Sequence, residues 1–77
     1  MGQLIYYNVC FHMNPIASFE LPENAEKYAE REKSRRMKIL EHRKNDLTAG
    51  EYRSIKRSVE YGLEVREVVV ELQDRLD

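Results

Sequence analysis

The chain has 77 residues, with 13 Lys or Arg and 14 Asp or Glu, so its formal net charge is −1. Charged residues make up 35% and aromatic residues 9% of it, which leaves too little apolar material for a large ligand cavity but too regular a pattern for a disordered chain. The single Cys10 excludes an intrachain disulfide, and no apolar run approaches the roughly 20 residues of a membrane span. We therefore expect one small domain over residues 1–77, located in the cytoplasm.

The first 21 residues predict a β-hairpin. The stretch "QLIYYNVCFHM" is rich in residues that favour strands, and we expect a strand from about Leu4 to His12. The Asn14-Pro15 pair that follows is typical of a turn, and a short alternating stretch comes after it. Because neighbouring strand residues face opposite ways, Tyr6 and Tyr7 cannot both face inward. Tyr6 is therefore a candidate contact for a partner.

Residues 22–46 predict a first long helix. Pro22 suits a first-turn position, and Glu23 and Glu26 complement a helix N-terminus. The interior consists mostly of good helix formers, and Asn45 with Asp46 ends the segment.

Residues 48–76 are interpreted as a second helix. Thr48 and Glu51 have the spacing of a capping box at its start. Because "EVREVVVEL" contains three successive valines shortly after Gly62, a C-terminal strand is a rival interpretation. Polar residues at steps of three or four favour the helix. The expected fold is thus α+β, with a short N-terminal β-hairpin packed on an antiparallel pair of long helices.

Basic residues of the first helix form a row. Their steps of three or four place them on one side of a helix, and we call Lys27, Arg31, Arg35, Lys38 and His42 the basic ridge. Such a ridge is either a solvated or internally paired face, a protein-binding surface, or a set of phosphate contacts. Arg36 and Arg43 lie instead within the apolar stripe of the same helix, which indicates a helix that its own domain does not fully cover.

The second helix, if continuous, carries a matching acidic row. The residues Glu60, Glu64, Glu67 and Glu71 recur at steps of three or four. This row is either a solubilising face or a surface that docks on a basic groove of another protein.

No catalytic or metal motif accompanies these features in the sequence. Cys10 and His12 are two apart on the expected strand, but His42 is the only other His or Cys, and a structural zinc site needs four ligands. The three glycines fit no phosphate-binding loop. We expect neither enzymatic activity nor a cofactor or metal.

Two resemblances bear on function. Residues 39–60, "ILEHRKNDLTAGEYRSIKRSVE", resemble the helix, Thr-x-x-Glu-aromatic cap and second helix of SHOCT-type domains. Residues 31–57 hold ten Lys or Arg against four acidic residues, so the charge of the chain is polarised. The small, charge-polarised chain as a whole is similar in style to bacteriophage host-takeover proteins, which bind a host machine. That resemblance implies a non-enzymatic protein-binding module acting on a large cytoplasmic assembly, such as a Clp-type protease ATPase or RNA polymerase. Self-association is a further expectation, and a small nucleic-acid-binding regulator using the basic ridge is the alternative.

Overall fold

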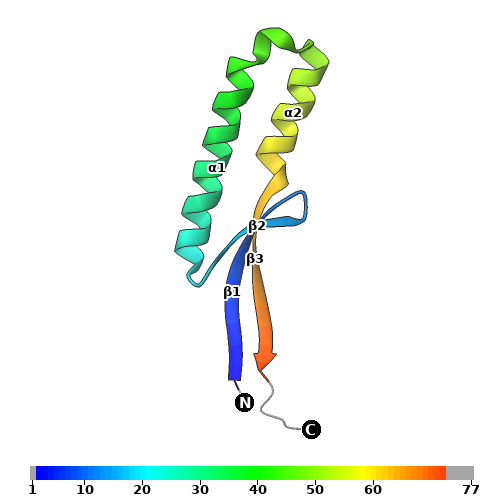
Figure 1. Cartoon of the computed structure of the whole chain (residues 1–77). Helices are drawn as coiled ribbons and strands as arrows, with labels where there is room; N and C mark the ends of the chain where they lie inside the picture. Colours follow the sequence, from blue (N-terminus) through cyan, green and yellow to red (C-terminus); the bar gives the residue numbers. More distant parts are fainter. Residues whose placement is uncertain (1, 73–77) are drawn as a thin grey trace.

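A computed structural model describes residues 2–72 of the chain, which adopts an elongated α+β structure (Figure 1). The principal extents are 60 × 23 × 14 Å, and the radius of gyration is 17.1 Å, whereas a compact domain of this length has about 11.5 Å. A helical hairpin occupies one end of the long axis, and two strands extend toward the other end (Figure 1).

The sheet has three antiparallel strands in the order β2-β1-β3. Strand β1 (Gly2–Phe11) pairs along its whole length with β3 (Leu63–Leu72), but β2 (Asn14–Phe19) pairs only with residues 7–11 of β1. Residues 2–6 and 68–72 therefore form a ribbon of only two strands, which we call the arm. The N-terminal β-hairpin is confirmed, and β3 adds a strand to it.

The hairpin turns two residues earlier than the sequence indicates. His12 and Met13 form the connection with φ values of 51° and 70°, and positive φ at both residues is the pattern of type I′ hairpin turns. Asn14 and Pro15 already belong to β2, where Asn14 lies opposite Phe11. The predicted turn at these two residues is wrong, because the twist of the paired strands favours this two-residue connection.

The helices are α1 (Pro22–His42) and α2 (Ala49–Gly62), joined through the 3-10 turn η1 (Lys44–Asp46). They run antiparallel, side by side (Figure 1). The capping box is confirmed: the Glu51 amide donates to the Thr48 hydroxyl at 3.1 Å, and the Thr48 amide donates to the Glu51 carboxylate at 3.0 Å. The backbone donor at Thr48 lowers the pKa of Glu51. No helix within residues 2–72 is long and apolar enough to cross a membrane.

The second helix is half as long as the sequence indicates. It ends at Gly62, and residues 63–72 form β3, so the interpretation of residues 48–76 as one helix is wrong where the structure describes them. The physical reason is pairing: the valine run lies opposite Leu4, Ile5 and Tyr6 of β1, where β-branched and aromatic side chains pack well across strands. The first helix also ends earlier, at His42 rather than at residue 46.

The core is thin. The buried apolar residues within the described part of the chain are Val9, Cys10, Ala25, Leu40 and Val59. Gly62 is buried where α2 becomes β3, and a Cβ there would lie 3.0 Å from the rings of Phe11 and His12. The helical hairpin is thereby held against the end of β1.

Candidate functional site

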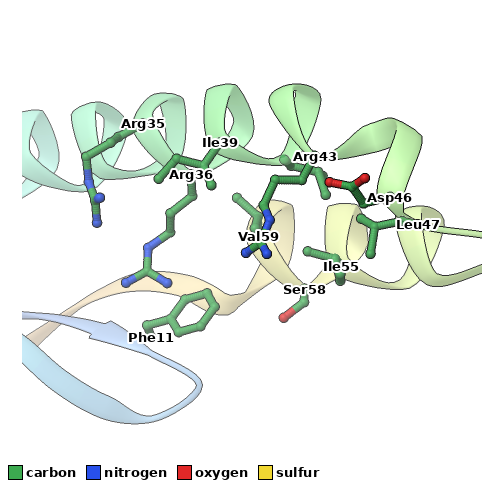
Figure 2. A pocket seen from close by; sticks show the side chains of 11 residues that line it. Phe11, Arg35, Arg36, Ile39, Arg43, Asp46, Leu47, Ile55, Ser58 and Val59 are labelled. Carbon is green, nitrogen blue, oxygen red and sulfur yellow. The ribbon is translucent and has the colours of Figure 1, made fainter.

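A groove of about 540 Å³ lies between α1 and α2 (Figure 2). Phe11 lies at one end of it, and Leu47 lies at the other. Its remaining apolar lining comes from both helices and consists of Ile39, Leu40, Ile55 and Val59. Three arginines also line it: Arg35 and Arg36 of α1, and Arg43, which directly follows the last residue of that helix. The groove thus combines an apolar surface with a concentration of positive charge.

Arg36 connects the groove to the sheet. Its guanidinium carbon lies 4.1 Å from the centroid of the Phe11 ring, and its Nε donates to a carboxylate oxygen of Glu32 at 3.0 Å. Figure 2 shows the Arg36 side chain extending from α1 toward Phe11. The aliphatic stem covers apolar surface while the charged end keeps polar and aromatic partners.

Glu32 is the buried polar residue of the described chain. Its carboxylate accepts hydrogen bonds from Arg35 and from Arg36. The pKa of Glu32 lies below its ordinary value, chiefly because Arg35 donates a hydrogen bond to the carboxylate. Burial raises this pKa, and the hydrogen bond from Arg36 lowers it further. The same pairing raises the pKa of Arg35. One carboxylate thus balances two guanidinium groups, which leaves one positive charge over at this end of the groove.

Arg43 supplies positive charge at the other end. No carboxylate of residues 2–72 lies within ion-pair distance of it, although Asp46 also lines the groove. Arg36 lies on α1, and Arg43, the C-cap residue of that helix, is seven positions further along, which corresponds to about two helical turns, or about 10.5 Å. Ile39 and Leu40 lie between them in sequence. An apolar surface between two cationic positions can bind an apolar segment that carries negative charge at a matching spacing.

The basic ridge is exposed along its whole length. All five of its residues, Lys27, Arg31, Arg35, Lys38 and His42, are exposed on α1. Arg35 differs from the other four because it is paired with Glu32 and also lines the groove. Among the described residues, no ion pair joins the ridge to the acidic residues of α2 and β3.

The acidic row predicted on a continuous second helix does not exist as a row. Glu60 lies on α2, whereas Glu64, Glu67 and Glu71 lie on β3. Because successive strand residues alternate between faces, Glu64 faces one side of the sheet while Glu67 and Glu71 face the other. Glu64 accepts a hydrogen bond from Arg66 at 2.8 Å. The prediction of a single acidic row on one helix face is therefore wrong, whereas contact of these four residues with a partner stays a prediction.

The remaining candidates are separated from one another. Tyr6 is half-buried in the arm, opposite Val68. Cys10 is buried, while His12 lies in the exposed hairpin turn with its ring hydrogen-bonded to the Ser58 hydroxyl. Within residues 2–72, no three His, Cys, Asp or Glu side chains gather as metal ligands.

Sequence reasoning missed both the groove and the arm. The groove had a signal, because Arg36 and Arg43 fall within an otherwise apolar helical stripe. The valine run was a sequence signal for the arm, but it was assigned to a helix. Comparisons of the chain with protein-family models, with curated proteins and with solved structures find no match. The SHOCT-like pattern and the resemblance to host-takeover proteins therefore stay predictions.

Proposed function

We propose that this chain is a non-enzymatic protein-binding module whose groove binds an acidic, amphipathic helix of a partner protein. The observation that carries the proposal is the apolar surface between Arg36 and Arg43, open between two helices. Placing a helix in an apolar groove is a recurring mode of recognition, read through residues spaced three, four and seven apart. A third helix laid along α1 and α2 would bury the exposed part of their facing surfaces.

The charges restrict the partner. An acidic residue opposite Arg36 and another seven positions away opposite Arg43 would match the 10.5 Å or so between these positions. Apolar residues at the intervening third and fourth positions would meet Ile39 and Ile55, which are 46% and 40% exposed. Charge-assisted contacts of this kind set orientation and specificity more than affinity. The expectation that the partner belongs to a large cytoplasmic machine stays a prediction.

Fluorescence anisotropy with a labelled helical peptide tests the proposal. The peptide carries Glu at two positions seven apart and Leu or Ile at the third and fourth positions between them. We expect binding in the micromolar range, and at least a tenfold loss for Arg43→Glu. Lys38→Glu is the matched control, because it makes the same charge change five positions earlier, on α1, at a residue outside the groove lining. Its affinity should stay within about twofold.

The opposite results would refute the groove as the site. Equal losses for Arg43→Glu and Lys38→Glu would mean that the peptide responds only to net charge. A peptide with Lys in place of both Glu residues should bind at least tenfold more weakly. Equal binding of the two peptides would contradict the role of the arginines.

The alternative function, nucleic-acid binding, is favoured by the exposure of all five ridge residues. Lys27, Arg31 and Lys38 would then neutralise phosphates, and affinity for random DNA would fall steeply with salt because counterions are released on binding. A gel-shift series from low to physiological salt tests this directly. Absence of retardation at the lowest salt removes the alternative, whereas retardation abolished by Arg31→Glu supports it.

A further inference from the structure

The charge of the chain is divided between the two ends of the molecule. Residues 31–57 hold ten Lys or Arg and four Asp or Glu, whereas the other described residues hold two and eight, so the formal charges are +6 and −6. Figure 1 shows residues 31–57 as the end of the helical hairpin that lies away from the arm. The molecule is 60 Å long, and salt screens charges beyond about 8 Å at physiological ionic strength. The negative end therefore does not cancel the positive one.

Two hollows lie on the positive end, outside the groove. The first, of about 490 Å³, lies on α1 and contains Lys38. The second, of about 610 Å³, lies over η1 and the first part of α2, and its charged residues are Lys44, Arg53 and Lys56. The Tyr52 hydroxyl in the second hollow donates a hydrogen bond to the Glu41 carboxylate in the first, so the two hollows adjoin. We call them together the cationic face.

The cationic face is distinct from the groove. Of the residues that line it, Leu47 alone also lines the groove. Lys38 is two positions from Arg36 on α1, so their side chains leave the helix in nearly opposite directions. Within residues 2–72, no carboxylate lies at ion-pair distance from any of the four cations of the face. All four are thus available to a negatively charged ligand.

The cationic face has charge without apolar anchors. None of the large apolar residues exposed on the described part of the chain lines it, whereas Ile39 and Ile55 line the groove. Protein partners gain most of their affinity from a few well-packed, desolvated side chains. A phosphate backbone can be bound by charge alone. The cationic face therefore fits a nucleic acid better than an acidic protein.

The side chains of the face favour one kind of nucleic acid. Single strands are held by stacking bases on aromatic rings, but Tyr52 is bonded to Glu41, and the Lys44 ammonium lies 5.1 Å from the centroid of its ring. Duplex RNA is recognised largely through 2′-hydroxyl groups, which donate as well as accept hydrogen bonds. The acceptors at the centre of the face are engaged, Glu41 by Tyr52 and Thr48 by the amide of Glu51. Double-stranded DNA remains as the fitting ligand.

We infer that the cationic face binds the phosphate backbone of double-stranded DNA without reading its sequence. Two helices side by side are about 20 Å across, which is too wide for a major groove of about 12 Å, so the contacts are with phosphates. The groove stays free, and the chain can hold a partner helix and DNA together. The inference does not depend on the proposed function. It also differs from the alternative given there, in which Lys27 and Arg31 contact phosphates.

Fluorescence anisotropy with a labelled DNA duplex of about 20 base pairs and random sequence tests the inference. Four phosphate contacts predict a slope of about −3.6 for log K against log salt, and so a loss of affinity of about 150-fold between 50 and 200 mM salt. Lys56→Gln and Arg53→Gln should each make the slope shallower by about one. Lys27→Gln is the matched control, because it removes an exposed cation of α1 that lies outside both hollows. Its slope should equal that of the wild type.

Four results would overturn the inference. The first is no binding at 50 mM salt, and the second is an unchanged slope in both Lys56→Gln and Arg53→Gln. The third is an equal effect of Lys27→Gln, which would place the contacts on the basic ridge. The fourth is competition by duplex RNA or polyglutamate as strong as that by DNA at equal charge. Circular dichroism checks that the variants fold, and their substituted residues are all exposed.

The acidic-peptide assay distinguishes failure of this inference from failure of the proposed function. Lys56 lies outside the groove lining, so Lys56→Gln should bind the peptide within about twofold of wild type. A chain that binds the peptide but not DNA retains the proposed function and refutes the cationic face. A chain that binds DNA with the expected slope but not the peptide gives the reverse result.

Discussion

Arg36 and Phe11 join the helical hairpin to the sheet, with the guanidinium carbon of Arg36 4.1 Å from the centroid of the Phe11 ring. The contact spans α1 and the last residue of β1. Both residues also line the groove, and Phe11 lies at one end of it (Figure 2). One contact therefore contributes to the packing of the fold and to the shape of the proposed binding surface.

A double-mutant cycle measures this contact. Phe11→Leu and Arg36→Met each remove it while keeping apolar bulk, and we expect a coupling free energy of about 0.5–1 kcal/mol from urea unfolding. The cycle cancels the separate loss of the hydrogen bond from Arg36 to Glu32. Additive effects of the two substitutions would show that the ring and the guanidinium do not interact in solution.

The stability of the protein should depend on the charge of Glu32. Its pKa is lowered in the folded state, chiefly by the hydrogen bond from Arg35, so the carboxylate contributes stability that is complete above its unfolded pKa of about 4.3 and is lost as the pH falls through the folded value. Glu32→Gln should therefore lose less stability than the wild type between pH 7 and pH 3. Urea unfolding at both pH values measures this, with exposed Glu30→Gln as the control. A wild-type pH dependence that survives in Glu32→Gln contradicts the assignment.

Position 62 needs a glycine because there is no room for a side chain, and not because of its backbone conformation. A Cβ at this position would lie 3.0 Å from the rings of Phe11 and His12, so Gly62→Ala should destabilise the fold by about 1–3 kcal/mol. Gly50→Ala is the matched control, since its Cβ would meet nothing closer than the Thr48 hydroxyl at 4.0 Å. That change should be neutral, or stabilising by up to about 1 kcal/mol. Thermal unfolding distinguishes the two, and equal midpoints would contradict the packing described.

The hairpin turn can be improved. Met13 has a φ of 70° and is 70% exposed, so it adopts a left-handed conformation with few contacts to offset the cost of about 1–2 kcal/mol. Met13→Gly should stabilise the protein by about 0.5–1 kcal/mol, after the greater freedom of glycine in the unfolded chain is counted. His12→Gly should gain less, because it removes the hydrogen bond to Ser58. A destabilised Met13→Gly variant in chemical unfolding would contradict the turn geometry.

Local signals in the sequence were reliable where one residue contacts its near neighbours. Thr48 and Glu51 predicted a capping box, and both of its hydrogen bonds are present. Pro22 marks the first residue of α1. Arg36 and Arg43 were recognised as charges within an apolar stripe, and both line the groove. These features depend on helical spacing alone, which the sequence states directly.

The error in the second helix has a definite physical cause. The polar residues from Glu60 to Glu71 recur at steps of three or four, as on a helix face. On β3, however, Glu64 is exposed on one face and Glu67 and Glu71 are exposed on the other, so both faces of this strand accept charged residues. Periodicity therefore could not distinguish the two structures, and pairing of Val68, Val69 and Val70 with β1 decides for the strand.

By itself, the sequence determined the α+β class, the N-terminal hairpin, the first helix, the start of the second, and the exposed basic ridge. These follow from propensity and from contacts between residues close together in the chain. Only the tertiary structure decided that residues 63–72 form β3, that the acidic residues are divided between two faces, and that Phe11 and Arg36 meet. Each of these depends on residues far apart in sequence, whose pairing is favourable only after the chain between them has folded.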